Sequence, residues 1–332
     1  MARRTRAAAI ASATWRDGVH LTGTSIWCDA RRGKGVWFVS SLERVDRAQR
    51  MALAKGVGQL IATDTTIAML ERAGRGDLSA PYRQRFTLGT LRLELVPSGR
   101  GLGAAALLAD DAGRRVLYAG SVRTRSGGLG EAGEVRACDA VVVGAPYGEV
   151  RHAFPAIDDA AAQLVAWVRA QHVVERTPVL FVDTVLDALE IAARLQRDDL
   201  ASILRPVAAR EIAVIASRVA KVARLVAPKR AKAPRVYVCV DGDRAGAIEA
   251  AGDRPITALV SGRAIDGPDG CDAAFAWAGA AGRADLLGWI EATGAKEVFV
   301  TGACAHAIVA TLGARARVLG PPHQMQLFEG AK

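Results

Sequence analysis

Residues 35–47 have the sequence Gly-Val-Trp-Phe-Val-Ser-Ser-Leu-Glu-Arg-Val-Asp-Arg, an apolar run that passes directly into a polar one. The apolar part, residues 35–40, has the composition of a short β-strand. The polar residues that follow include Glu43 and Asp46, and they mark the end of that strand. We therefore expect a strand followed at once by a loop that carries two carboxylates.

The remainder of the first half also consists of predicted strands and turns. Residues 90–96 alternate apolar and polar side chains, as a half-buried strand does. Residues 105–108 and 115–119 flank the turn 110–113, which predicts a hairpin. Residues 139–143 form an apolar run that ends at a glycine and predict a buried strand.

In the second half, helical and strand patterns alternate. This alternation predicts a mostly parallel sheet covered by helices, so the expected fold class is α/β with a β-rich first half. Predicted helices span residues 158–171, 185–195, 211–226 and 284–293, and predicted strands span 178–182, 235–240, 257–261 and 297–301.

Taken in order, these segments resemble the metallo-β-lactamase fold with a β-CASP insertion. The nearest likeness is to bacterial exonucleases associated with DNA ligase, also described as mRNA 3′-end processing factors. The resemblance implies an αββα sandwich, residues 1–172 and 276–332, with an inserted α/β cap, residues 173–275. It rests on residues 21–24, 28–30, 61–66, 97–105, 117–121, 138–148, 260–262, 294–301 and 321–328.

Enzymes of this family hold two metal ions with His and Asp side chains and use them to activate water against a phosphodiester. In the family, four of the ligands lie in a His-x-His-x-Asp-His loop. Here Ser41 and Glu43 stand at the first two His positions, Val45 at the Asp, and Asp46 at the last His. Shifting the alignment by one residue makes Asp46 the Asp and Arg47 the final His, and again leaves no imidazole.

The other ligand positions of the family are also changed. Arg100 replaces a histidine, Ser121 replaces the bridging aspartate, and Gly302 lies in place of a late histidine. Residues 278–281, Ala-Gly-Ala-Ala, replace a Ser-Asp-His segment. The resemblance therefore implies a catalytically inactive homologue, with no bound metal or other cofactor and with vestigial cleft positions.

An arginine at a ligand position repels a divalent cation and binds phosphate well. One interpretation is that Arg100, with Arg47, Arg123 and Arg125, binds nucleic-acid phosphate in place of the lost ions. The other is that Arg100 pairs with Glu43 or Asp46 and only neutralises the pocket. Both interpretations follow from the sequence.

The formal charge of +10 and the pI near 9.8 favour a polyanionic partner, most simply DNA or RNA. Seven Lys or Arg residues lie between Arg218 and Arg235 with no acidic residue among them, and we expect Lys229, Arg230 and Lys232 to contact phosphates. We expect a nucleic-acid-binding or scaffold subunit in DNA repair or RNA processing. By analogy with the family, its companion is an active nuclease paralogue, a DNA ligase or a helicase.

Two other functions are consistent with the sequence. A single metal on Glu43, Asp46 and Asp139 would give a residual phosphodiesterase, and a structural subunit would need no nucleic-acid affinity. Five scattered cysteines without a CxxC pair indicate a reducing compartment, the cytoplasm. The longest apolar runs are too short to span a membrane.

Overall fold

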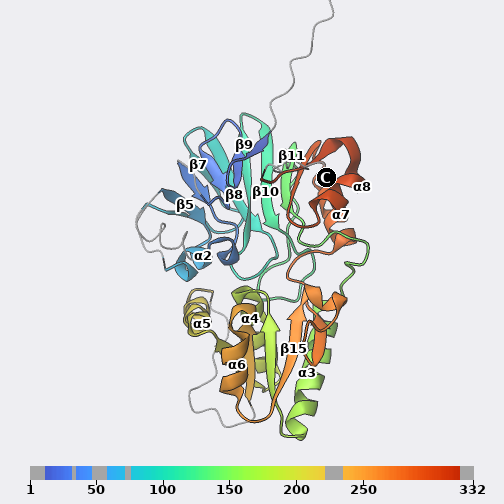
Figure 1. Cartoon of the computed structure of the whole chain (residues 1–332). Coiled ribbons are helices and arrows are strands. Elements are labelled where there is room, and N and C mark those ends of the chain that lie inside the picture. The colour runs from blue at the N-terminus through green and yellow to red at the C-terminus, as the bar shows by residue number, and fades with distance from the viewer. Residues whose placement is uncertain (1–11, 32–34, 47–57, 72–75, 221–234, 322–332) are drawn as a thin grey trace, which may run out of the picture.

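Two lobes stacked along one axis make up the computed structural model of the chain (Figure 1). The structure describes residues 12–31, 35–46, 58–71, 76–220 and 235–321. Both ends of the described chain lie in the upper lobe, whereas the middle of the sequence forms the lower lobe, so the chain passes twice between them (Figure 1).

The upper lobe is built on two β-sheets. One has six strands in the order β1-β2-β3-β4-β5-β6, and the other has seven in the order β18-β17-β11-β10-β9-β8-β7. Buried side chains of both sheets, such as Phe38 and Leu107, form one shared core. The strands of the first sheet are β1 (Ala13–Trp15), β2 (Val19–Leu21), β3 (Ile26–Cys28), β4 (Val36–Phe38), β5 (Gln59–Ala62) and β6 (Leu78–Ser79). Those of the second are β7 (Arg85–Leu88), β8 (Leu91–Pro97), β9 (Ala105–Asp111), β10 (Arg114–Ser121), β11 (Ala140–Gly144), β17 (Glu297–Thr301) and β18 (Ala316–Val318).

Helices lie on the outer faces of this pair of sheets. On one side, α2 (Asp64–Met69) places Ile67 against Trp37 and Leu60 of the first sheet. On the other side, α7 (Arg283–Ala292) and α8 (Ala305–Leu312) pack on the second sheet. The upper lobe is thus layered helix, sheet, sheet, helix. Because β11 is covered on both faces, its sequence is a continuous buried run.

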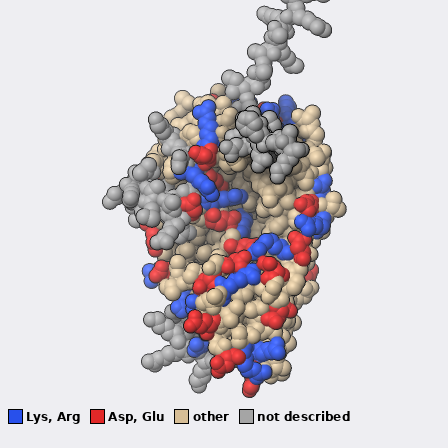
Figure 2. All heavy atoms as spheres, viewed as in Figure 1, with Lys and Arg blue, Asp and Glu red and all other residues tan. Residues whose placement is uncertain are grey.

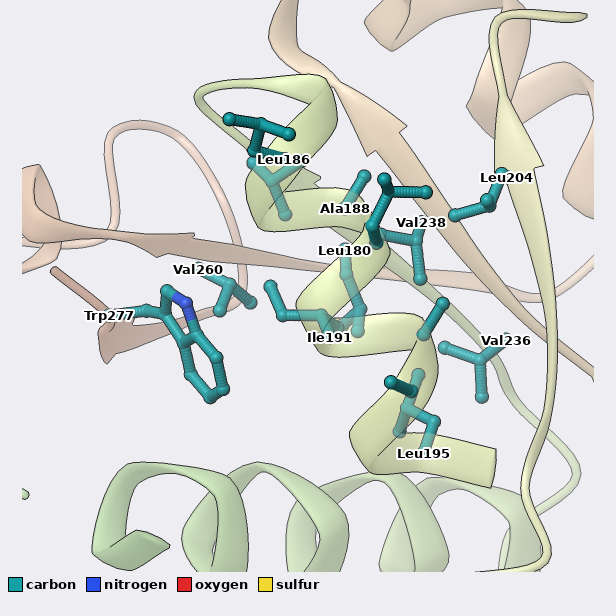
Figure 3. Close-up of a cluster of buried hydrophobic side chains, with 14 of the residues drawn as sticks. Leu180, Leu186, Ala188, Ile191, Leu195, Leu204, Val236, Val238, Val260 and Trp277 are labelled. Atoms are coloured by element: carbon teal, nitrogen blue, oxygen red, sulfur yellow. The ribbon is translucent and has the colours of Figure 1, made fainter. Parts of the chain in front are cut away.

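The lower lobe holds a five-stranded sheet, all of whose described pairings are parallel, in the order β13-β14-β12-β15-β16. Side chains alternate between its faces: Leu180 and Val182 enter the core under α3, α4 and α5, whereas Val179 and Phe181 face α6. Figure 3 shows the first core, in which Ile191 and Leu195 of α4 lie among strand residues such as Leu180 and Val236. The elements are α3 (Ile157–Val173), β12 (Thr177–Val182), α4 (Val185–Arg197), β13 (Ala201–Arg205), α5 (Val207–Val219), β14 (Arg235–Val240), α6 (Arg244–Ala251), β15 (Pro255–Ser261) and β16 (Ala273–Ala276).

The α/β class predicted from the sequence is confirmed, and so is the hairpin, in which β9 and β10 pair antiparallel around the turn at Gly113. The expected lobe boundary at residue 172 lies in the last turn of α3, and α3 packs on the lower sheet and shares its core. The lower lobe therefore begins one helix earlier, near Ile157. The helix expected at 211–226 corresponds to α5, which spans Val207–Val219; residues 221–226 of the expected helix lie outside the described residues.

Within the described residues, no helix combines the length and the apolar character needed to cross a membrane.

Candidate functional site

Two of the residues expected to form a vestigial cleft, Glu43 and Arg100, meet where the two lobes join. After β4, the chain turns through a 3₁₀ helix, Leu42–Arg44, which directs the Glu43 side chain towards the lower lobe. A tight turn after β8 brings Arg100 to the same place. The start of α4 supplies Asp187, whose backbone N–H and carboxylate both bond to the helix-capping Thr184 hydroxyl.

Arg100 is held between two carboxylates. Its Nη1 and Nη2 donate to Asp187 Oδ1 and Oδ2 at 2.9 and 3.1 Å, and its Nε donates to Glu43 Oε1 at 2.9 Å. Nη2 also lies 2.6 Å from Glu43 Oε2. Burial alone lowers the pKa of Arg100, but Asp187 and Glu43 outweigh it and raise the pKa, so the guanidinium stays charged. For Glu43 the effects are reversed: burial raises the pKa of its carboxyl group, and the charge of Arg100 lowers it, but burial has the larger effect.

Residues 278–281 also reach this cluster. A Cβ added to Gly279 would lie 2.3 Å from Arg100 Nη1 and 2.7 Å from Asp187 Oδ1. Only a residue without a side chain leaves room here for the arginine–carboxylate pair.

A second buried pair lies one helical turn further along α4. Arg123, which follows β10, donates from Nη1 and Nη2 to the two oxygens of Glu190 at 2.7 and 2.6 Å. Asp187 and Glu190 are three residues apart and therefore share one face of the helix. Two arginines of the upper lobe thus dock on one face of a lower-lobe helix.

This geometry bears directly on the predicted phosphate ligands. Arg100 and Arg123 are 7% and 4% exposed, and carboxylates accept from both terminal nitrogens of each, so neither presents a free face to phosphate, in contrast to the first interpretation. The second interpretation, a neutralising pair with Glu43, is what the structure shows. Arg125 is half exposed and pairs with Asp285 at 2.9 Å. Arg47, Lys229, Arg230 and Lys232 lie outside the described residues.

Ser121 accepts a hydrogen bond from Arg44, a residue that sequence reasoning did not single out. Arg44 Nη2 donates to Ser121 Oγ at 2.7 Å, and Arg44 Nε lies 3.8 Å from Asp29 Oδ2. Asp29 itself accepts from the Ser40 N–H, the Ser40 hydroxyl and the Tyr118 hydroxyl. A guanidinium group therefore lies against the position at which the resemblance expects a bridging carboxylate.

The three carboxylates proposed for a single metal are not brought together. Asp139 accepts from the Arg115 N–H at the amino end of β11, whereas Glu43 and Asp46 line a cavity at the carboxyl end of that strand, beside Gly144. Among the described residues, no three His, Cys, Asp or Glu side chains are grouped so that they could hold a metal ion. Ser41 is buried, and its hydroxyl has no partner in the described part of the chain.

Charged side chains line the carboxyl ends of the lower-lobe strands, which face the upper lobe. Arg263 pairs with Asp183 and Asp241 at 3.0 and 2.7 Å, and Arg244 pairs with Asp241 and Asp269. Burial alone would raise the pKa of Asp241, but bonds from Arg244 and Arg263 lower it. Figure 2 shows acidic and basic groups side by side across the middle of this face. These carboxylates are therefore paired with arginines of the same lobe.

Comparison with known proteins adds a likeness of fold. No protein-family model matches the sequence, and no curated protein matches it either. Among solved structures, the chain is similar to a protein of unknown function from Enterococcus faecalis V583, with 13% identity and a TM-score of 0.54. The match covers 86% of this chain and 79% of that one. At this identity the likeness concerns the fold alone.

Proposed function

We propose that the chain is a catalytically inactive relative of the metallo-β-lactamase nucleases, with a β-CASP-like cap, and that it binds nucleic acid. In this proposal, the layered upper lobe corresponds to the αββα sandwich and the lower lobe to the cap. The partner we propose, by analogy alone, is an active nuclease paralogue, a ligase or a helicase.

One observation carries the proposal: positions that the resemblance assigns to metal ligands meet in space, although they are far apart in sequence. Glu43 contacts Arg100, the backbone at Gly279 abuts Arg100, and Glu43, Asp46 and Gly302 line one cavity. An unrelated fold would have no reason to gather these positions.

The residues present do not fit the two metals of the family. Zinc and manganese sites need imidazole or carboxylate donors with free lone pairs. Here Glu43 is already paired with Arg100, Ser121 accepts from Arg44, and Gly302 has no side chain. Two guanidinium groups add positive charge where two cations would have to bind. Catalysis through a metal pair therefore has no support in this donor set.

The nucleic-acid part of the proposal rests on charge. Of the 34 acidic residues, one, Glu329, lies outside the described part of the chain. Of the 44 Lys and Arg residues, 16 lie outside it. The described part is thus net negative, at −5, and the whole basic excess belongs to the remaining segments. Affinity for a polyanion should then depend on residues such as Lys229, Arg230 and Lys232.

Fluorescence anisotropy with single- and double-stranded DNA and RNA tests this proposal. We expect binding that weakens steeply between low and moderate salt, with a slope that falls by about one for each phosphate-contacting cation removed. The triple variant Lys229→Ala, Arg230→Ala, Lys232→Ala should lower both affinity and slope. The matched control Arg92→Ala, Arg197→Ala, Arg210→Ala removes the same charge from exposed positions and should change much less.

Two results would contradict the proposal. Absence of binding to every nucleic acid would favour a purely structural subunit. Degradation of the probes in manganese, lost with EDTA, would restore the enzyme interpretation.

A further inference from the structure

A cavity of about 500 Å³ lies beside the Arg100 cluster in the upper lobe. Its walls come from the first strands of the chain, the 3₁₀ helix, β10, and the carboxyl ends of β11 and β17. This volume is in the range of pockets that hold small organic molecules, and it is far larger than a single ion needs. The side chains that matter below are Trp15, Asp29, Glu43, Arg44, Asp46 and Tyr118.

The carboxylates in the wall already have partners. Asp29 accepts three hydrogen bonds, at 2.8 Å from the Ser40 N–H, 2.6 Å from the Ser40 hydroxyl and 2.8 Å from Tyr118. Burial and Asp29 raise the pKa of Tyr118, so its hydroxyl remains a donor. Glu43 is held by Arg100, and Asp46 lies 3.9 Å from Arg31 at the rim. None of the three carboxylates lacks a partner.

Arg44 is different. Only Nη2 donates a hydrogen bond, to the neutral Ser121 hydroxyl, and the Nε group has no acceptor within hydrogen-bond distance in the described part of the chain. Arg44 also forms a loose ion pair with Asp29, in which Nε lies 3.8 Å from Oδ2. Its side chain is 35% exposed, and it lines the cavity. Arg44 is thus held by one hydrogen bond and one loose ion pair, and its Nη1 donates no hydrogen bond in the described part of the chain, so this end of the guanidinium can receive an anion.

We propose that this cavity binds a nucleotide through its terminal phosphate, with Arg44 as the phosphate ligand. The inference rests on the proposed function, because it names the part of a nucleic acid that the site receives. Guanidinium groups bind phosphate oxygens through paired, charge-assisted hydrogen bonds. Trp15 supplies an aromatic wall of the kind on which a base stacks. The phosphate belongs either to a free mononucleotide or to the end of a strand.

Calorimetric titration with AMP, adenosine and inorganic phosphate tests the binding of the phosphate. We expect AMP to bind at least about tenfold more tightly than adenosine, since a charge-assisted bond contributes on that scale. Inorganic phosphate should compete with AMP. Equal affinity for AMP and adenosine, or no binding of AMP by the folded protein, would overturn the inference.

Variants then place the ligand in this cavity. Arg44→Gln should weaken AMP binding about tenfold or more, whereas Arg85→Gln, on an exposed arginine remote from the cavity, should not. Ala303 is exposed and lines the cavity, so Ala303→Glu adds a negative charge without disturbing the core. Ala303→Glu should bind AMP more weakly than Ala303→Gln, a comparison that remains informative if Arg44→Gln fails to fold. Equal affinities for these two variants would contradict the assignment.

Oligonucleotides with and without a terminal phosphate separate the two sources. A preference for the phosphorylated strand, lost in Ala303→Glu, assigns the site to strand ends, and tight AMP binding without that preference assigns it to free nucleotides. If long nucleic acids bind normally while AMP and phosphate do not, this inference fails and the proposed function stands. If neither binds, both fail.

Discussion

Arg100 and Asp187 form a two-point ion pair that joins the lobes, with Nη1 to Oδ1 at 2.9 Å and Nη2 to Oδ2 at 3.1 Å. The two residues are 87 positions apart, and both side chains are buried. With Glu43 on the other side of Arg100, the pair fills the junction between the lobes. Several consequences can be measured.

Removing the charge of Asp187 should destabilise the protein strongly. Asp187→Asn leaves the buried Arg100 with one carboxylate partner, and breaking a buried pair in this way costs about 3–5 kcal/mol. Asp198→Asn is the control, because the Arg169–Asp198 pair at 3.2 Å is exposed and contributes about 0–1 kcal/mol. Urea unfolding measures both. If the two variants lose a similar free energy of unfolding, the buried pair does not stabilise the protein more than the exposed pair does.

A methyl group at Gly279 should disturb the same pair. Gly279→Ala places a Cβ 2.3 Å from Arg100 Nη1, so the guanidinium or the Ala278–Ala281 segment has to move, at about 1–3 kcal/mol. Gly288→Ala is the matched control, because its Cβ meets no atom within 4 Å and α7 should gain about 0.5–1 kcal/mol of helix propensity. If Gly279→Ala is as stable as the wild type, the packing described around Arg100 is incorrect.

His152 should make stability fall in mild acid. Its Nδ1 accepts from the Gly148 and Glu149 N–H groups at 3.1 and 3.0 Å, and burial lowers its pKa below the usual 6.5. A lowered pKa in the folded state means that the neutral ring is favoured. Its contribution is therefore complete above about pH 6.5 and is lost as the pH falls through the folded pKa.

His152→Asn tests this, because the asparagine oxygen can take the place of Nδ1 and does not titrate. Between about pH 7 and pH 5, the melting temperature of the wild type should fall more than that of the variant. If the melting temperatures of the two proteins fall equally with decreasing pH, a group other than His152 causes the loss of stability in acid.

The sequence predicted local elements better than their assembly. The strands β8 to β11 and the helices α3, α4 and α7 follow from apolar periodicity within one segment. The lobe to which α3 belongs does not, because it depends on the sheet against which the helix packs, and β16 of that sheet lies far along the chain. Strand β13 and helices α6 and α8 were missed, since each is short and its pattern ambiguous.

The same limit applies to the site. The resemblance indicated which positions to inspect, and a pair of Arg100 with Glu43 or Asp46 was one of two interpretations of the sequence; the structure has the pair with Glu43. The partners on α4, Asp187 and Glu190, lie 87 and 67 residues from their arginines, and no local pattern connects them. Arg44 was overlooked because it falls between two ligand positions, and only the 3₁₀ turn brings its guanidinium to Ser121.

Metal stoichiometry tests the central claim most directly. Protein purified without chelators, then equilibrated with zinc or manganese and passed through a desalting column, should retain no stoichiometric metal, and EDTA should leave its melting temperature unchanged. Two ions retained per chain, together with a melting temperature that falls when they are removed, would contradict the account, because the nearby carboxylates Asp29 and Glu43 are already paired with Arg44 and Arg100.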